Sequence, residues 1–197
     1  MRGKRATYLA ESRGVHRSSG HARRVVLEDA ASMTKLEFMT SNLLKLSSGD
    51  VAAIVLPAGL VCAATDIGYI IVLVLIKGGS PFRMLQGIAF SVLGKPAYEG
   101  GVATMLLGLI LHVGIALGAA AMFFVLYRLS GVVREHWLVS GVLFGAAFYV
   151  FMQLVALPFT RLPPQSFPPP NWIPVFGAHV TAVGPVIAAV THWRSVK

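Results

Sequence analysis

The sequence is poor in charged residues. Lys, Arg, Asp and Glu make up 13% of its 197 residues, whereas a typical soluble domain carries about 25%. Hydrophobic residues make up 55%, and the mean hydropathy is +0.70. This composition argues against an ordinary soluble domain and predicts a chain whose surroundings are mostly lipid. The length leaves room for one bundle of a few helices and for no large soluble domain.

Cysteine is almost absent. The chain has one, Cys62, which excludes a disulfide framework or a cysteine-based zinc site within a single chain. Cys62 stands among Ala and Val, where a lone cysteine usually behaves as a small buried hydrophobe.

The motifs of common enzyme classes are also missing. The sequence contains no nucleophile elbow, no phosphate-binding Gly-Lys loop and no paired catalytic carboxylates. It also lacks the Cys-x-x-Cys-His motif that attaches haem. The sequence therefore favours a protein that is not an enzyme, and it predicts no cofactor and no metal.

Acidic residues are scarce relative to basic ones. Eight Asp and Glu stand against 17 Lys and Arg, for a formal net charge of +9. Such an excess can indicate nucleic-acid binding, but seven of the 17 basic residues precede residue 25 and the others flank apolar segments. This distribution is typical of topology determinants and of contact with anionic lipid headgroups. We therefore expect a lipid bilayer as the partner, and no nucleic acid.

Four long stretches are free of charge except for Asp66. Each is long enough to cross a hydrocarbon core of about 30 Å at roughly 1.5 Å per helical residue. The predicted fold class is an all-α integral membrane bundle of four transmembrane helices. The predicted spans are residues 51–76, 102–127, 137–157 and 175–193.

Two further segments lie between the spans. Residues 84–94 are apolar but too short to cross, which predicts a short interfacial or re-entrant helix after Ser80-Pro81 that ends at Gly94. Residues 158–174 are rich in proline. They cannot be helical throughout, and we expect extended polyproline II structure outside the hydrocarbon.

Residues 1–48 form a basic polar tail before a transmembrane domain at 49–197. The tail lacks an apolar run of signal-peptide length, so we expect no cleavable secretory signal, and we expect disorder. Two interpretations stay open. The true start is Met33 or Met39 and the tail extends the gene model, or the tail is real and touches anionic headgroups.

Lys and Arg are distributed unequally between the two sides of the predicted bundle. The tail, residues 128–136 and the C-terminus hold 13, while residues 77–101 and the proline-rich segment hold four. Without the seven that precede residue 25 the ratio is still six to four. The positive-inside rule therefore places both termini in the cytoplasm, for a multi-pass protein of the inner membrane.

Two titratable residues interrupt the predicted spans at the same depth. Asp66 lies ten residues before the end of the first span, and His112 lies ten residues after the start of the second. Antiparallel neighbours would bring the two together near the bilayer midplane. Because an intramembrane carboxylate is costly, it is usually paired or functional. The alternatives are a structural hydrogen bond that fixes helix register, and a protonated Asp66 exposed to lipid.

Gln153 and His179 form a second, shallower polar level, about one turn from the outer ends of the third and fourth spans. With the deeper pair they predict a polar track that opens outward and stops at the midplane. Two histidines on different spans, His112 and His179, also suggest haem ligation as a hypothesis, but their depths differ by about 9 Å. A metal site made of Asp66, His112 and His179 would need ligands from three helices to converge.

Small residues recur at helical spacing in two spans. Gly114 and Gly118 form one GxxxG pair, and Gly141 and Gly145 form another. Such pairs predict surfaces on which helices approach closely.

The chain resembles a group of small bacterial membrane proteins to which no activity is assigned. The resemblance covers about residues 51–193 and implies a four-helix inner-membrane protein. The matching features are Thr65-Asp66-Ile67, Ser80-Pro81, Leu93-Gly94, residues 97–101, Leu111-His112, Gly141, Gly145-Ala146, Pro158, His179 and Gly184-Pro185. Lys95-Pro96 and Tyr98 depart from the small residues and the Phe that this group more often has there.

Three functional hypotheses follow. The first is a small transporter or channel-like component that uses the Asp66/His112 pair, alone, as a homo-oligomer or with a partner membrane protein. The second is a structural or accessory membrane protein whose polar residues only lock helix packing. The third is a membrane redox component that carries haem. The sequence does not specify a substrate.

Overall fold

The computed structural model describes residues 48–170 and 172–196, together with Met33 and Glu37. Almost all of the predicted tail at residues 1–48, with its expected disorder and headgroup contact, therefore lies outside the described residues. Within the described part of the chain there is no strand, which confirms the all-α prediction. The elements in chain order are α2 (Ser48–Ile76), α3 (Pro81–Leu93), η1 (Lys95–Tyr98), α4 (Gly101–Leu129), α5 (Gly131–Glu135), α6 (Trp137–Phe151), η2 (Met152–Ala156), η3 (Leu157–Phe159), α7 (Trp172–Ala178), η4 (His179–Val183) and α8 (Gly184–Ser195).

Four of the helical stretches are long and apolar enough to cross a membrane, so the chain is a multi-pass membrane protein. They are Val51–Ile76, Gly101–Leu129, Trp137–Phe159 and Trp172–Ser195. The fourth begins three residues before the predicted start, so that Pro174 lies in its first turn. Proline is tolerated there because the first N–H groups of a helix have no intrahelical partner.

Two of the spans are continued through π-helical turns. In the third, η2 follows α6, and in the fourth, η4 joins α7 to α8. Gly184 and Pro185 follow η4 directly, and the missing N–H of proline interrupts the regular hydrogen-bond ladder. The turn that precedes Pro185 is therefore wider than a regular α-helical turn.

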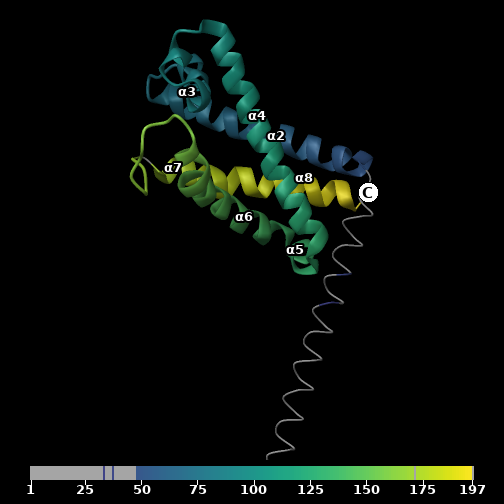
Figure 1. Ribbon diagram of the computed structural model, residues 1–197. Coiled ribbons are helices and arrows are strands. Elements are labelled where there is room, and N and C mark those ends of the chain that lie inside the picture. The colour runs from purple at the N-terminus through teal and green to yellow at the C-terminus, as the bar shows by residue number, and fades with distance from the viewer. Residues whose placement is uncertain (1–32, 34–36, 38–47, 171, 197) are drawn as a thin grey trace, which may run out of the picture. The chain divides into compact units, whose positions relative to one another are not determined.

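The short helix between the first two spans is α3, as predicted. Ser80 caps its start, Pro81 occupies the first position, and Gly94, with φ of +71°, ends it. The helix packs against the first half of α4 (Figure 1). Gly108 allows this contact, because a Cβ atom there would overlap the carbonyl oxygen of Leu85.

A buried amide joins the same two helices. Gln86 is 1% exposed. Its Nε2 donates to the carbonyl oxygen of Gly101 and to Oγ1 of Thr104, each at a distance of 3.2 Å. Thr104 donates in turn to the carbonyl oxygen of Gly101. Helix α3 is thus fixed to the start of α4 by hydrogen bonds as well as by close packing.

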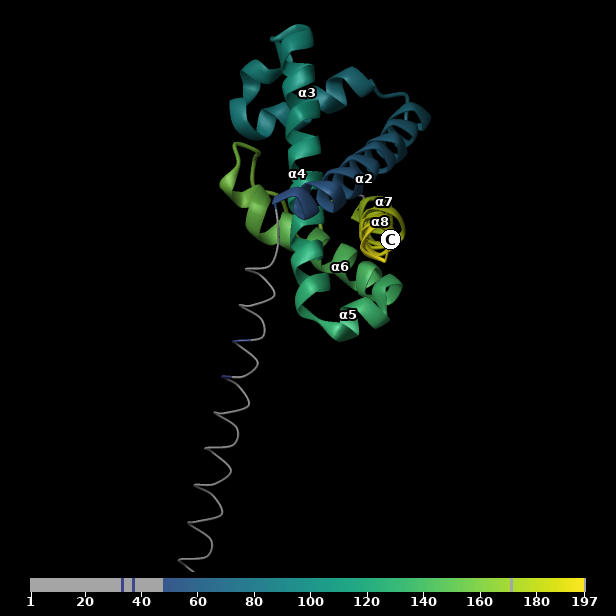
Figure 2. The same ribbon diagram turned by 90° about the vertical axis from the view of Figure 1, so that its right-hand side faces the viewer.

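Helices α6 and α8 run side by side, whereas α4 crosses α2 and α8 steeply (Figures 1 and 2). The close approach of α6 and α8 depends on glycine. A Cβ atom on Gly184 would overlap the carbonyl oxygen of Gly141, and one on Gly145 would overlap that of His179. The pair Gly141 and Gly145 therefore provides the close helix contact that its spacing predicts.

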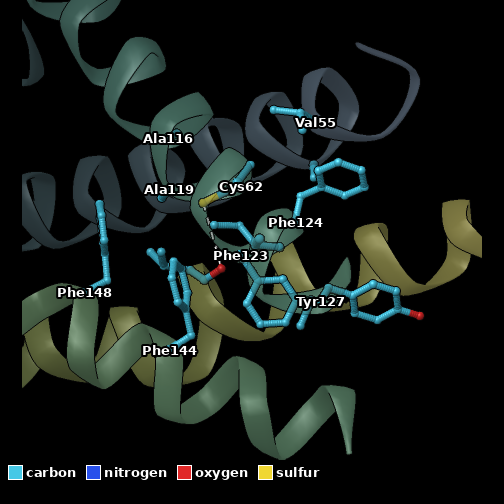
Figure 3. Packing of buried hydrophobic residues seen from close by; sticks show 14 of the residues in the cluster. Val55, Cys62, Ala116, Ala119, Phe123, Phe124, Tyr127, Phe144 and Phe148 are labelled. Atoms are coloured by element: carbon cyan, nitrogen blue, oxygen red, sulfur yellow. Dashed lines mark hydrogen bonds between the residues drawn. The ribbon is translucent and has the colours of Figure 1, made fainter. Parts of the chain in front are cut away.

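The apolar core lies where α2, α4, α6 and α8 meet (Figure 3). Rings from α4 and α6 fill its centre, with Phe123 and Phe144 edge to face at 5.3 Å. Cys62 of α2 is 1% exposed, and its Sγ lies 3.9 Å from the carbonyl oxygen of Val183. This confirms that the lone cysteine is a small buried residue.

The proline-rich segment is not helical throughout, as predicted, but Pro158 and Phe159 lie in η3 and Trp172 to Pro174 lie in α7. The expected polyproline II structure is therefore wrong at both ends of the segment and stays a prediction for the non-helical residues 160–170. The backbone N–H of Arg161 donates to the carbonyl oxygen of Ser91 over 2.8 Å. The segment is thereby attached to α3. We refer to this side of the bundle as the α3 end, and to the opposite side, where α5 lies, as the α5 end.

Candidate functional site

A cavity of about 620 Å³ lies between the spans, directly beside the aromatic core. Residues of all four spanning stretches contribute to the cavity wall, and residues of α3 complete it. Most of the lining is apolar. The polar side chains in the wall are Asp66, Ser91, His112, Thr160 and His179.

Asp66 lies within α2 and is 8% exposed. Its Oδ2 is 3.7 Å from Nε2 of His112, so the two groups are in ion-pair range but beyond a hydrogen bond. Its Oδ1 has no hydrogen-bond partner among the residues that the structure describes. Oδ1 is itself buried, and the Asp66 side chain lines the cavity with unused capacity to accept hydrogen bonds.

His112 lies within α4 and joins that helix to α2. Its Nε2 is 3.3 Å from the carbonyl oxygen of Ala63. A carbonyl only accepts, so Nε2 carries the proton and donates. In the neutral ring Nδ1 then has a lone pair, and a proton taken up there would make an imidazolium beside Asp66.

His179 lies at the first position of η4 and also lines the cavity. Its Nδ1 donates to the carbonyl oxygen of Val175 over 2.9 Å. The ring lies edge to face with Tyr149 at 5.4 Å. These contacts fix the orientation of the ring and leave Nε2 as an acceptor in the neutral form.

Both π-helical turns face the cavity. Met152 and Ala156 of η2, and His179 and Val183 of η4, line its wall. Single π turns inside α-helices are frequent at functional sites. Nothing in our sequence analysis indicated them, although Gly184-Pro185 marks the end of one.

Gln153 does not join the three deeper residues. It lines a separate pocket of about 240 Å³, together with the proline-rich segment. The structure thus brings Asp66, His112 and His179 to one cavity and leaves Gln153 outside it.

The cavity wall is exposed along α4 and α6. Ile115 is 40% exposed, Met122 is 46% exposed and Phe151 is 39% exposed. Gly118, which is also exposed, lies between the first two on α4. Because these positions belong to membrane spans, the opening faces lipid. We call this opening, bounded by Ile115, Gly118, Met122 and Phe151, the lateral portal.

A second polar cluster lies at the α5 end, and sequence reasoning assigned it no role. The hydroxyl of Tyr127 and Nδ1 of His192 share a hydrogen bond of 2.8 Å. Trp137 stacks on the same imidazole at 5.0 Å. The cluster joins the ends of α4 and α8 to the start of α6, and the aromatic and His residues near the span ends were its available signal.

In the described part of the chain, no three His, Cys, Asp or Glu residues are grouped so that they could hold a metal ion. His112 and His179 line one cavity, but Nε2 of His112 is directed at the carbonyl of Ala63. Ligation of haem by both rings would require His112 to give up that contact.

Comparisons of the chain with protein-family models, with curated proteins and with solved structures found no match. The resemblance to small bacterial inner-membrane proteins therefore stays a prediction from the residues quoted above. Any function must be argued from the cavity itself.

Proposed function

We propose that this chain is a small membrane transport protein in which Asp66 and His112 take up and release protons beside a cavity that can hold a ligand. The observation that carries the proposal is the Asp66–His112 contact of 3.7 Å in the wall of a cavity of about 620 Å³. Ionisable residues inside spans are costly, and they commonly mark ligand or proton pathways.

The state of the Asp66 carboxylate supports this role over a purely structural one. A carboxylate retained only to hold helices together gains most when both oxygens accept hydrogen bonds. Oδ1 has no such partner in the described residues, and Oδ2 has His112 only at 3.7 Å, although the Asp66 side chain lines a cavity with room for a partner. The neighbouring π turns are a second feature common at functional sites.

A structural or accessory role is the second candidate. The contact from His112 to the carbonyl of Ala63 is the observation that favours it, because this contact fixes α4 against α2. Under that alternative, replacing Asp66 would lower stability and change no transport.

The location and orientation of the chain are also proposals. The tail, residues 128–136 and the C-terminus together hold 13 Lys and Arg, against four on the other side. This difference supports a bacterial inner-membrane protein with both termini in the cytoplasm. The apolar residues exposed on the spans are suited to the bilayer. Contact of the tail with anionic headgroups, and assembly with a second copy or a partner membrane protein, stay predictions.

Proton flux into vesicles tests the transport proposal. The full chain is reconstituted in phosphatidylcholine vesicles that contain a pH-sensitive dye, and a potassium diffusion potential drives protons inward. We expect flux with the wild type and none with Asp66→Asn. Thr65→Val is the matched control, because the exposed Thr65 hydroxyl bonds only carbonyls of its own helix, those of Val61 and Cys62.

Two results would contradict the proposal. One is an absence of flux from the wild type together with lower stability of Asp66→Asn, which would favour the structural role. The other is equal flux from all three proteins. An absorbance spectrum of the same preparation tests the haem hypothesis, since a haem protein shows an intense band near the blue end of the spectrum.

A further inference from the structure

We propose that the cavity binds a lipophilic amine, a molecule with an apolar body and one protonated nitrogen that donates to the carboxylate of Asp66. The inference rests on the proposed function, because it names the class of ligand that the cavity takes. It is argued from the polar atoms in the wall, the apolar lining and the lateral portal.

The first argument is the unpaired carboxylate oxygen. Asp66 is 8% exposed, and its Oδ1 has no partner among the described residues. Burying an ionised carboxylate in apolar surroundings is costly unless it is paired and hydrogen-bonded. An ammonium group supplies both the opposite charge and the donors. His112 lies 3.7 Å from Oδ2, beyond hydrogen-bond range, so the carboxylate still has capacity to accept from the ammonium.

The other polar atoms in the wall also favour a ligand that donates. Nδ1 of His179 donates to Val175, so its Nε2 accepts. Thr160 donates to the carbonyl oxygen of Leu157. No Lys or Arg is among the described residues that line the cavity, and a ligand with a carboxylate or phosphate would meet the carboxylate of Asp66 there. The wall therefore disfavours anionic ligands.

The apolar lining fits the rest of such a molecule. A volume of about 620 Å³ lies in the usual range of small-molecule sites, roughly 300–1,000 Å³. Phe148 and Phe151 contribute aromatic rings to the lining, and aromatic rings attract cations. Met84, Met122 and Met152 are flexible and can adapt to bodies of different shape.

The lateral portal provides the route from the bilayer, where a lipophilic amine accumulates. Gly118 lies in the portal, and a Cβ atom added there would meet nothing within 4 Å. A side chain added at Gly118 therefore begins in open space, and we expect a leucine there to narrow the opening. Gly114 lies one turn earlier, is equally open and does not line the cavity. The two glycines form a matched pair for testing entry.

Three fluorescent probes test the assignment. Dansylcadaverine carries an ammonium, N-pentyl dansylamide is neutral, and dansyl-6-aminohexanoate is an anion of similar length. Each is titrated against the full chain in phosphatidylcholine vesicles, with empty vesicles subtracted. We expect saturable binding of dansylcadaverine, with the neutral and anionic probes weaker by about tenfold or more, since a charged hydrogen bond contributes roughly 1.5–3 kcal/mol.

The variants locate the binding. Asp66→Asn should weaken the binding of dansylcadaverine by a similar factor and leave the binding of the neutral probe unchanged. Gly118→Leu should abolish or greatly slow binding, and Gly114→Leu should match the wild type. Because the probe series is measured on the wild type, it stays decisive even where a variant folds poorly.

Several outcomes would overturn the assignment. They are equal binding of the neutral and ammonium probes, tighter binding of the anionic probe, and no saturable binding of any of the three probes. Binding is measured without a gradient, so it is separate from proton flux. Amine binding without flux contradicts the transport proposal alone, and flux without selective amine binding contradicts the ligand class alone.

Discussion

At the scale of single residues, the molecule uses its few polar side chains in two different ways. At the α5 end, Tyr127 and His192 form a hydrogen bond of 2.8 Å with each other. In the cavity, Oδ1 of Asp66 is without a partner in the described residues. The first arrangement stabilises the bundle, whereas the second leaves a group available to a ligand.

The Tyr127–His192 hydrogen bond should contribute measurably to stability. Tyr127→Phe keeps the ring in the core and removes only the hydroxyl. We expect a loss of about 0.5–1.5 kcal/mol in the free energy of unfolding, typical of one hydrogen bond. Unfolding in detergent micelles measures it, and Tyr98→Phe, on a 41% exposed residue, is the control. Equal stability of both variants would contradict a stabilising role for this cluster.

Depth along a helix could be read from the sequence, but direction around its axis could not. Asp66 and His112 were each placed ten residues from the same side of the bundle, and the structure brings them to 3.7 Å. Gln153 was placed at a suitable depth and lies in a different pocket. Each residue turns a helix by about 100°, so the side that a residue faces depends on how the helices pack.

At the scale of elements, glycine determines which helices touch. Gly108 brings α3 against α4, and Gly184 brings α8 against α6. The two GxxxG pairs look alike in the sequence. Gly141 and Gly145 are in close contact with the fourth span, whereas a Cβ atom at Gly114 or Gly118 would meet nothing within 4 Å. The spacing alone could not distinguish a packed pair from an open one.

Helix α3 should depend on Gly108 for its position. Gly108→Ala places a Cβ atom on the carbonyl oxygen of Leu85, so α3 must shift away from α4. We expect a loss of about 1–3 kcal/mol in the free energy of unfolding, as for overpacked cores. Gly114→Ala, at an open position of the same helix, should cost little. A Gly108→Ala variant as stable as Gly114→Ala would show that the contact is not needed.

At the scale of the whole molecule, the number of spans and their approximate bounds followed from uncharged length alone. The π turns and the cavity did not, because they arise from the packing of four helices and from the interrupted ladder before Pro185. The two sides of the bundle are equally clear in the structure: Arg161 joins the proline-rich segment to α3, and His192 joins three helix ends at the α5 end.

The proposed orientation predicts which loops are reached from outside the cell. The single cysteine, Cys62, is 1% exposed and gives a low background. New cysteines at Glu99→Cys and Gln165→Cys, at the α3 end, should react with an impermeant maleimide on intact cells. Glu135→Cys, at the α5 end, should react only after lysis. The opposite pattern would place both termini outside.

The central claim is that Asp66 is a protonatable group that faces a cavity open to lipid, and carbodiimide modification tests it most directly. Dicyclohexylcarbodiimide is apolar and adds to a protonated carboxyl, which gives an acylurea that mass spectrometry can locate. With the full chain in vesicles, we predict modification at Asp66, much slower modification in Gly118→Leu, and an unchanged rate in Gly114→Leu. An Asp66 that stays unmodified, or one that reacts equally fast in all three proteins, would contradict the account.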